Sequence, residues 1–377
     1  MSGSATGSLQ AALKRAAGRM TRATVIERFL IAIASIALAL VLGAIIVAAT
    51  GYDPLLFVYS LLYGAIGNAS NIAFTLRQST MLILAGVAVA VAFRAGVFNI
   101  GVQGQFVVGG FATAVTILVL APVLPGGIFG GVLLVVITTL VGISAGGAYG
   151  ALPGIMKAYA DANEVITTIM LNFIATGVVF FIVDQFLRPA GAAAPNTEQF
   201  PEYVTLPPVL FEGGSFSVIG FAVALVTAVG VYFVMTRTRS GYDLVTSGYQ
   251  QEAAAYSGVD PKRTIVSTMV FSGMIAGLTG SLFAIMILGY YSDPSTFPTY
   301  GFDAIAVSLL AANNPLAVIP SGLLFGGLDA GQQYISFTLD MPSELVDGIV
   351  GLVVLFVATP ELFRLAGHRA GLGGEDE

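Results

Sequence analysis

The sequence predicts an all-α, polytopic membrane protein, and three observations support this prediction. Apolar residues make up 56% of the 377 residues, and the mean hydropathy is +0.89. Charged residues make up only 10%, whereas soluble domains carry roughly 25%. The apolar residues also gather into runs close to the roughly 20 residues that a helix needs to cross a bilayer core. We therefore expect about ten transmembrane segments in contact with membrane lipid, some of them short or broken.

The N-terminal segment, residues 1–28, is polar, small and basic, and the first apolar run follows over residues 29–50. This run is longer than the hydrophobic part of a signal peptide. We interpret it as an uncleaved first span; a removed signal sequence is the alternative. The transmembrane domain is expected to cover residues 29–359, and residues 360–377 form a tail. Since nearly all basic residues fall on one side of the spans, both termini are expected to be cytoplasmic.

A break between two spans carries the first candidate site. Further spans are expected over residues 79–93, 106–123, 130–149 and 165–183. Residues 94–105 combine three glycines with Asn99, Gln103 and Gln105, a composition that does not suit a lipid-facing helix. Each amide offers both a donor and an acceptor, so these side chains would line a path for a neutral, hydroxyl-rich solute. The alternative is an ordinary glycine-rich turn at the inner surface.

Two features of the next spans concern helix packing. Gly142, Gly146 and Gly150 recur at every fourth position, which predicts a small-residue ridge for close packing against another helix. Residues 153–163 are expected to form an inner loop. In the following span, Asn172 shares a face with two threonines, and this face either bonds to a neighbouring helix or lines the path.

Two polar loops are expected to meet partners. Residues 185–215 form a proline-rich outer loop with acidic residues, which is a candidate docking surface for an external protein. Residues 236–263 form a basic inner loop between spans at 216–235 and 265–288. Its centre, residues 250–256, is rich in helix-forming Gln, Glu and Ala, so we expect a short helix outside the bilayer.

The C-terminal part is less regular and carries two carboxylates. Short apolar pieces are expected over residues 301–312 and 316–331, followed by a last span over residues 345–358. A charge at the centre of a span costs about 2.5 to 3.5 kcal/mol on insertion scales. We interpret Asp303 as the cap of its helix at the outer interface. Asp329 either lines the path or pairs with one of the glutamines that follow it.

Three ordered motifs carry a family resemblance. They are NIGVQGQ at residues 99–105, NEVITTIMLN at residues 163–172 and GFDAIAV at residues 301–307. They resemble segments of the branched-chain-amino-acid, ribose and nucleoside group of ABC permeases, within it the nucleoside and simple-sugar branch. The resemblance covers residues 51–364.

The inner loop resembles the coupling segment of such permeases. Glu252, Ala253, Ala254 and Gly258 match the EAA-x3-G motif, whose helix docks into a groove of the ATPase subunit. Small alanines allow close docking, the glutamate gives a directional contact, and the glycine ends the helix. A chance match in an alanine-rich chain is the alternative. Two departures are that the second half of the motif is not recognisable, and that Asp329 stands where the group more often has an uncharged or basic residue.

The resemblance implies a permease subunit without catalytic residues, in a prokaryotic plasma membrane. Its partners would be cytoplasmic ABC ATPase subunits, a second, identical or related permease subunit, and an external solute-binding protein. The solute would be a simple sugar such as glucose, or alternatively a nucleoside, moved by alternating access.

The residues themselves exclude several other functions. No GxxxxGK[ST] phosphate-binding loop occurs, so the energy must come from a separate ATPase. The absence of cysteine and the single histidine, His368, exclude thiolate chemistry and histidine metal motifs. The sequence has no basic, aromatic patch of the kind that would predict nucleic-acid binding. No cofactor is expected. An ion-coupled secondary transporter remains an alternative that depends on Asp329. An intramembrane aspartyl protease would need a GxGD motif, which the sequence lacks.

Overall fold

The computed structural model describes residues 40–206, 210–211, 216–256, 258–339, 341–342 and 344–352. Throughout these residues the regular structure is helical, and no strand is present. Six of the described helices are long and apolar enough to cross a membrane. The all-α, polytopic prediction is therefore confirmed, while the total of about ten segments stays a prediction. The spanning helices are α4 (Ala69–Arg94), α5 (Val102–Leu120), α6 (Gly127–Ala160), α7 (Glu164–Ile182), α8 (Val218–Arg237) and α11 (Pro261–Leu282).

Shorter elements complete the described chain. Helices α7 and α11 each continue into a π-helical segment, Val183–Leu187 and Phe283–Leu288 respectively. The remaining helices are α3 (Pro54–Ile66), α9 (Arg239–Tyr249), α10 (Gln251–Tyr256), α12 (Tyr300–Leu310) and α13 (Val318–Thr338), with 3-10 turns at Glu202–Val204 and Pro294–Thr296. The expected first and last spans are described only over residues 40–49 and 344–352, where both are helical; the rest of each lies outside the described residues.

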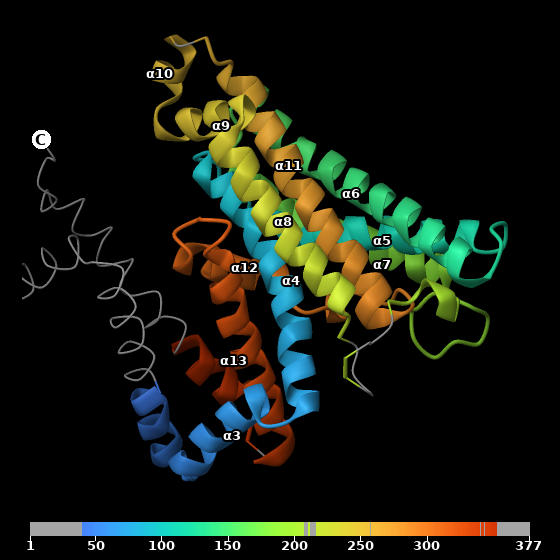
Figure 1. The fold of residues 1–377 in the computed structure, drawn as a ribbon, viewed down its shortest axis with the longest axis vertical. Helices are drawn as coiled ribbons and strands as arrows, with labels where there is room; N and C mark the ends of the chain where they lie inside the picture. The colour runs from blue at the N-terminus through green and yellow to red at the C-terminus, as the bar shows by residue number, and fades with distance from the viewer. Residues whose placement is uncertain are drawn as a thin grey trace, which may run out of the picture. The chain divides into compact units, whose positions relative to one another are not determined.

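The core of the fold is the contact of α6 with α11, which run side by side (Figure 1). A methyl group on Gly146 would lie 2.4 Å from the Gly273 carbonyl oxygen and 2.6 Å from the Gly277 Cα. Real side chains do not approach backbone so closely, so only glycine permits this helix spacing. The predicted packing role of the ridge at Gly142, Gly146 and Gly150 is confirmed, because each of the three abuts atoms of α11.

Helix α6 is longer than the sequence pattern predicted. The expected inner loop at residues 153–163 is wrong, because the helix continues through Pro153 as far as Ala160. It ends at Asp161, which adopts a left-handed conformation with φ 50°. Proline is tolerated inside membrane helices because neighbouring groups satisfy the freed carbonyl. Helix α4 is extended too, since it begins at Ala69 rather than near residue 79.

The described chain divides into two compact units. One covers residues 65–330 and contains the six spanning helices. In this unit α4 is almost wholly buried and packs against α11 and α12. The other unit joins the described parts of residues 1–64 and 331–377. Within it the rings of Tyr63 and Tyr334 lie 5.3 Å apart, and a methyl group on Gly43 would touch Ile349.

Candidate coupling site and translocation path

The polar loop at residues 236–263 folds into two short helices, α9 and α10. Figure 1 shows them beyond the ends of α8 and α11, which they connect. The Thr238 hydroxyl caps α9 by accepting a hydrogen bond from the Gly241 backbone N–H at 3.1 Å. Helix α9 turns Gly241, Leu244 and Ser247 inward, where they are buried. The short helix predicted over residues 250–256 is confirmed as α10.

Helix α10 ends at the glycine of the EAA-x3-G motif. Gly258 adopts φ +85°, a conformation that glycine reaches without strain. Its N–H donates to the Ala255 carbonyl at 3.0 Å, and the Val259 N–H donates to the Ala254 carbonyl at 3.1 Å. These two bonds are those of a Schellman motif, in which glycine occupies the left-handed position. The prediction that Gly258 terminates the helix is therefore confirmed.

The structure bears unequally on the four residues predicted to couple to an ATPase. Glu252 and Ala253 belong to α10, and the structure describes their backbone only. Ala254 is fully buried within the chain, whereas Tyr256 is 95% exposed. Ala254 therefore packs inside this subunit in the observed conformation. The role of Glu252 and Ala253 toward an ATPase stays a prediction.

Asn99 and Gln105 form a buried amide pair at the break between α4 and α5. The Asn99 Nδ2 donates to Gln105 Oε1 at 2.9 Å and to Ser272 Oγ at 2.8 Å. The Gln105 Nε2 donates back to Asn99 Oδ1 at 3.1 Å, and that oxygen also accepts from the Gly101 N–H at 3.0 Å. Ser272 in turn donates to the Ala88 carbonyl at 2.6 Å. The pair thus joins the break to α4, α5 and α11.

Gln103 and Asn172 satisfy backbone groups that broken helices leave open. The Gln103 Oε1 accepts from the Gly301 N–H, near the start of α12, at 2.8 Å. The Asn172 Oδ1 accepts from the Gly104 N–H at 2.8 Å, and its Nδ2 donates to the Ile100 carbonyl at 2.9 Å. Unpaired backbone groups are costly away from water. In this conformation all four predicted amides are buried and bonded to protein, which favours the structural alternative over solute contact.

Asp303 of α12 and Asp329 of α13 have partners other than those predicted. Helix α12 is capped at Thr299, so the expectation that Asp303 is the cap is wrong. Asp303 lies in the first turn and accepts a hydrogen bond from the Thr299 hydroxyl at 3.1 Å. The Asp329 carboxylate is hydrogen-bonded by the Gln78 side chain, which also accepts from the Tyr300 hydroxyl at 2.7 Å.

Neither glutamine after Asp329 is shown as its partner. Gln332 instead donates to the Asp347 carboxylate. The expected pairing was wrong because it used neighbours along one helix, whereas the actual partner, Gln78, comes from α4. Half-burial of Asp329 between α4, α12 and α13 is consistent with either a structural or a path-lining role.

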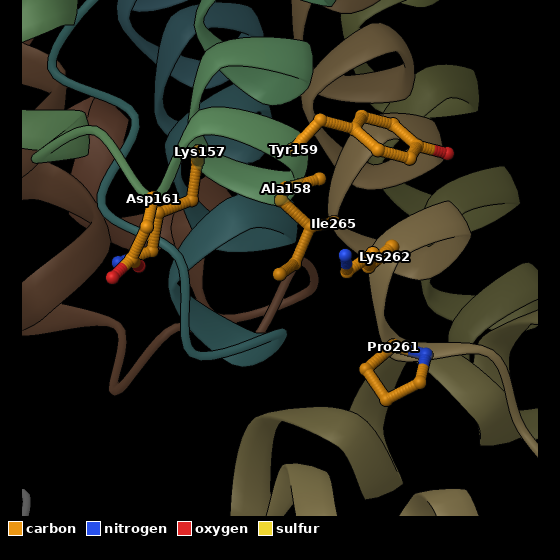
Figure 2. Close-up of a pocket in the computed structure, with 7 residues that line it drawn as sticks. All are labelled: Lys157, Ala158, Tyr159, Asp161, Pro261, Lys262 and Ile265. Atoms are coloured by element: carbon orange, nitrogen blue, oxygen red, sulfur yellow. The ribbon is translucent and has the colours of Figure 1, made fainter.

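A cavity of about 440 Å³ lies where α6 ends and α11 begins (Figure 2). It is lined by Lys157, Ala158, Tyr159, Asp161, Pro261, Lys262 and Ile265. The Lys157 ammonium lies 3.1 Å from the Glu164 carboxylate, and the Lys262 ammonium lies 5.5 Å from the centre of the Tyr159 ring. Ala158 and Ile265 also belong to an apolar cluster with Val97 of the break. The cavity therefore borders both the break and the first turn of α11, which follows α10.

Several contributors to this region escape sequence-based reasoning. Ser272, Gln78 and Tyr300 lie far along the chain from the groups that they bond. A lone polar residue in an apolar helix was the only local signal. It indicates that a polar residue has a partner but does not identify the partner.

In the part of the chain that the structure describes, six helices could span a membrane, and a polar helix pair lies between α8 and α11, so the class is a multi-pass membrane protein. Its sequence carries no GxxxxGK[ST] ATP-binding loop. The family described as the branched-chain amino acid transport system / permease component matches residues 71–358. The chain therefore belongs to this family, and it is a permease of an ABC importer rather than an enzyme. Such a permease works with ATPase subunits and a solute-binding protein.

Relatives place the chain in the nucleoside and sugar branch. The guanosine ABC transporter permease protein NupP of Bacillus subtilis is 33% identical over 350 residues, covering 90% of this chain and 95% of the relative. The nucleoside ABC transporter permease protein NupB of Lactococcus lactis is 29% identical, covering 88% and 91%. The glucose ABC transporter permease protein TsgB13 of Haloferax volcanii is 30% identical, covering 89% and 87%. No solved structure matches the chain significantly.

Proposed function

We propose that this permease moves a nucleoside across the prokaryotic plasma membrane into the cell, with a simple sugar such as glucose as the second candidate. The nucleoside proposal is supported by the guanosine and nucleoside permeases among its relatives. The sugar candidate is supported by the glucose permease, whose identity and coverage are similar. Both solutes are neutral and rich in hydroxyl groups.

The transport mechanism is alternating access between an outward-open and an inward-open state. A loaded solute-binding protein docks on the outer loop, residues 185–215. ATP then closes the ATPase dimer, and the resulting motion enters the permease through α10. A second permease subunit, identical or related, completes the path. The termini lie in the cytoplasm, on the side of the ATPase.

The observation that carries this proposal is the α9–α10 pair. A helix of one and a half turns, closed by a left-handed glycine, is too short to be stable by itself, and it packs on α9 and α11. Its outer face carries Tyr256, which is exposed. We assign Glu252 the polar contact with the ATPase and Ala253 the close approach to it. Ala254 and Gly258 hold the helix to the permease.

The described part of the outer loop supports a docking surface with a fixed base. The Thr197 N–H donates to the Tyr291 carbonyl at 2.8 Å, and the Phe200 N–H donates to the Gly289 carbonyl at 2.7 Å. The Arg188 side chain bonds both Asp184 and the Ala192 carbonyl. Because these hydrogen bonds tie the loop to the helices, a movement of the loop on docking of a binding protein can be transmitted to the spans.

The path residues divide into two roles in this proposal. Asn99, Gln103, Gln105 and Asn172 hold the broken helices and exchange partners when the path opens. Asp329 contacts the path together with Gln78 and Tyr300, where a carboxylate, an amide and a phenol offer both donors and acceptors to a solute. A bare carboxylate facing lipid would be costly, so the open side of this group is covered by the path or by the second permease.

The test is uptake into vesicles that hold the permease with its ATPase and binding protein. Labelled guanosine and labelled glucose are compared, each with and without ATP. ATP-dependent uptake of guanosine alone is the expected result, and uptake of glucose alone would select the second candidate. Uptake that ignores ATP but collapses with the ion gradient would contradict the proposal and favour an ion-coupled transporter.

A further inference from the structure

The turn between α4 and α5, residues 95–101 and hereafter the connector, lies against α9 with backbone close to backbone. A methyl group on Gly248 of α9 would lie 2.5 Å from the Arg94 carbonyl oxygen and 2.7 Å from the Ala95 carbonyl carbon. A methyl group on Gly96 would lie 2.9 Å from the Gly248 carbonyl oxygen. No side chain separates these two segments. A contact of this kind does not yield by rotamer change, so a shift of α9 must displace the connector.

The next residue of the connector is held on its other side. Val97 is buried in a cluster with Ala158 of α6 and with Ile265 and Met269 of α11. Two of these residues line the cavity at the end of α6, which Figure 2 shows beside Lys262 and Pro261 at the start of α11. The connector thus lies between α9 and the two helices of the core contact.

The connector then reaches the amide pair. Asn99, three residues beyond Gly96, donates to Ser272 of α11 and to Gln105 of α5. Ser272 donates onward to α4. A displacement at Gly96 therefore arrives, within one short segment, at hydrogen bonds that join three spanning helices.

The contact of α9 also contains groups that are not satisfied in this conformation. The Ser247 hydroxyl, next to Gly248, is buried and has no hydrogen-bond partner in the described part of the chain. The same holds for the Thr268 hydroxyl of α11, one turn before Ser272. Helices α9 and α11 are in contact. Buried hydroxyls without partners are unfavourable, so an arrangement of α9 that gave these two groups partners would remove a cost that the observed packing carries.

We propose that Gly96 and Gly248 are positioning residues for transport, through which a shift of the coupling helices moves the connector and rearranges the amide pair at the break. This inference rests on the proposed function, because it assumes that an ATPase acts on α10. It goes further by identifying where the motion enters the membrane core. It also assigns a function to two glycines that lie outside the coupling motif.

The test compares two alanine variants in the full complex with ATPase and binding protein. Gly248→Ala places a methyl group against the Arg94 and Ala95 backbone, which separates α9 from the connector. Gly230→Ala, in α8, is the matched control because a methyl group there meets nothing within 4 Å. The readouts are solute uptake, ATP hydrolysis stimulated by the loaded binding protein, and their ratio.

The expected result is a loss of coupling. Gly248→Ala should lower the solute moved per ATP hydrolysed about tenfold while stimulated hydrolysis stays within about twofold of wild type. Gly230→Ala should match wild type in both. If uptake and hydrolysis in Gly248→Ala fall by the same factor, the role of Gly248 is merely structural and the inference is overturned. Wild-type values of both would overturn it too.

If the Gly248→Ala permease does not assemble with the ATPase, a second variant tests the same inference. Val97→Ala adds no atoms and loosens only the packing of the connector against Ala158, Ile265 and Met269. It should lower the same ratio about threefold with stimulated hydrolysis retained. A wild-type ratio in Val97→Ala would overturn the inference. If the wild-type complex itself shows no ATP-dependent uptake, the proposed function fails instead.

Discussion

The α6–α11 contact and the contact of α9 with the connector are both built on glycine, but they differ in redundancy. Along α6, three glycines at every fourth position abut α11, and α11 contributes Gly273 and Gly277 to the same contact. Between α9 and the connector, one glycine on each side makes the contact, and an unsatisfied hydroxyl lies beside it. The first contact is suited to holding helices at fixed spacing. The second is suited to being displaced.

The largest expected effect comes from breaking the redundant contact. Gly146→Leu would drive a side chain into the backbone of Gly273 and Gly277, which cannot rotate away. We expect the variant to lose at least about 3 kcal/mol of stability, at the upper end of overpacking costs, and to yield little folded protein. The measurement is the melting temperature and the monodisperse yield in detergent.

The control for this variant is Gly177→Leu in α7, where a Cβ meets nothing within 4 Å. It should fold normally, because its side chain enters open space on an apolar helix. Equal melting temperatures for the two variants would show that the α6–α11 contact is not the rigid part of the molecule.

A smaller effect is expected from the amide pair that the connector carries. Asn99→Ala removes the partner of the buried Gln105 amide, which costs about 1 to 3 kcal/mol. Gln105→Ala should cost a similar amount. Because both changes remove the same bonds, the double variant should be less destabilised than the sum.

The measurement is a double-mutant cycle on melting temperature, with Gln185→Ala as the control for loss of an exposed amide. In the described structure the exposed Gln185 donates a hydrogen bond to its neighbour Asp184, so its loss should have little effect. Additive losses for Asn99 and Gln105 would contradict the reciprocal pairing.

The smallest effect is expected at the ion pair beside the cavity. Lys157 and Glu164 lie 3.1 Å apart and are partly buried. Partial exposure to solvent screens the pair, so Glu164→Gln should cost about 1 kcal/mol or less. The loss should shrink as salt is added, since salt screens the wild-type pair.

Melting temperatures at low and high salt provide the check. The looser pair of Arg239 and Asp243, with atoms 4.0 Å apart and the arginine largely exposed, serves as the reference. Asp243→Asn should have no measurable effect. A salt-independent loss of several kcal/mol in Glu164→Gln would show that Glu164 acts in another way, for example through the first turn of α7.

Much of the fold could be predicted because a bilayer constrains sequence strongly. Apolar runs near 20 residues located α7, α8 and α11 to within a few residues. Residue spacing alone predicted the glycine ridge, and composition predicted α10. The continuation of α6 past Pro153 was missed because proline ends helices in water more often than in membranes.

The candidate site could be predicted only by residue type. The sequence identified Asn99, Gln103, Gln105 and Asn172 as unusual, but it did not identify the protein groups that they bond. Their partners come from distant positions, such as Ser272, and a local pattern contains no information on these. The contact of Gly96 with Gly248 was missed for the same reason, since both glycines read as ordinary turn or helix-end residues.

Coupling of transport to ATP through α10 is tested most directly by Glu252→Ala in vesicles that contain the ATPase and the binding protein. The expected result is normal amounts of the variant in the membrane, no uptake of labelled guanosine or glucose, and ATP-dependent uptake of one of them by wild type. Ala255→Ser, on the exposed part of the same helix, should transport normally. Undiminished uptake by Glu252→Ala would contradict the assignment of α10 as the coupling helix.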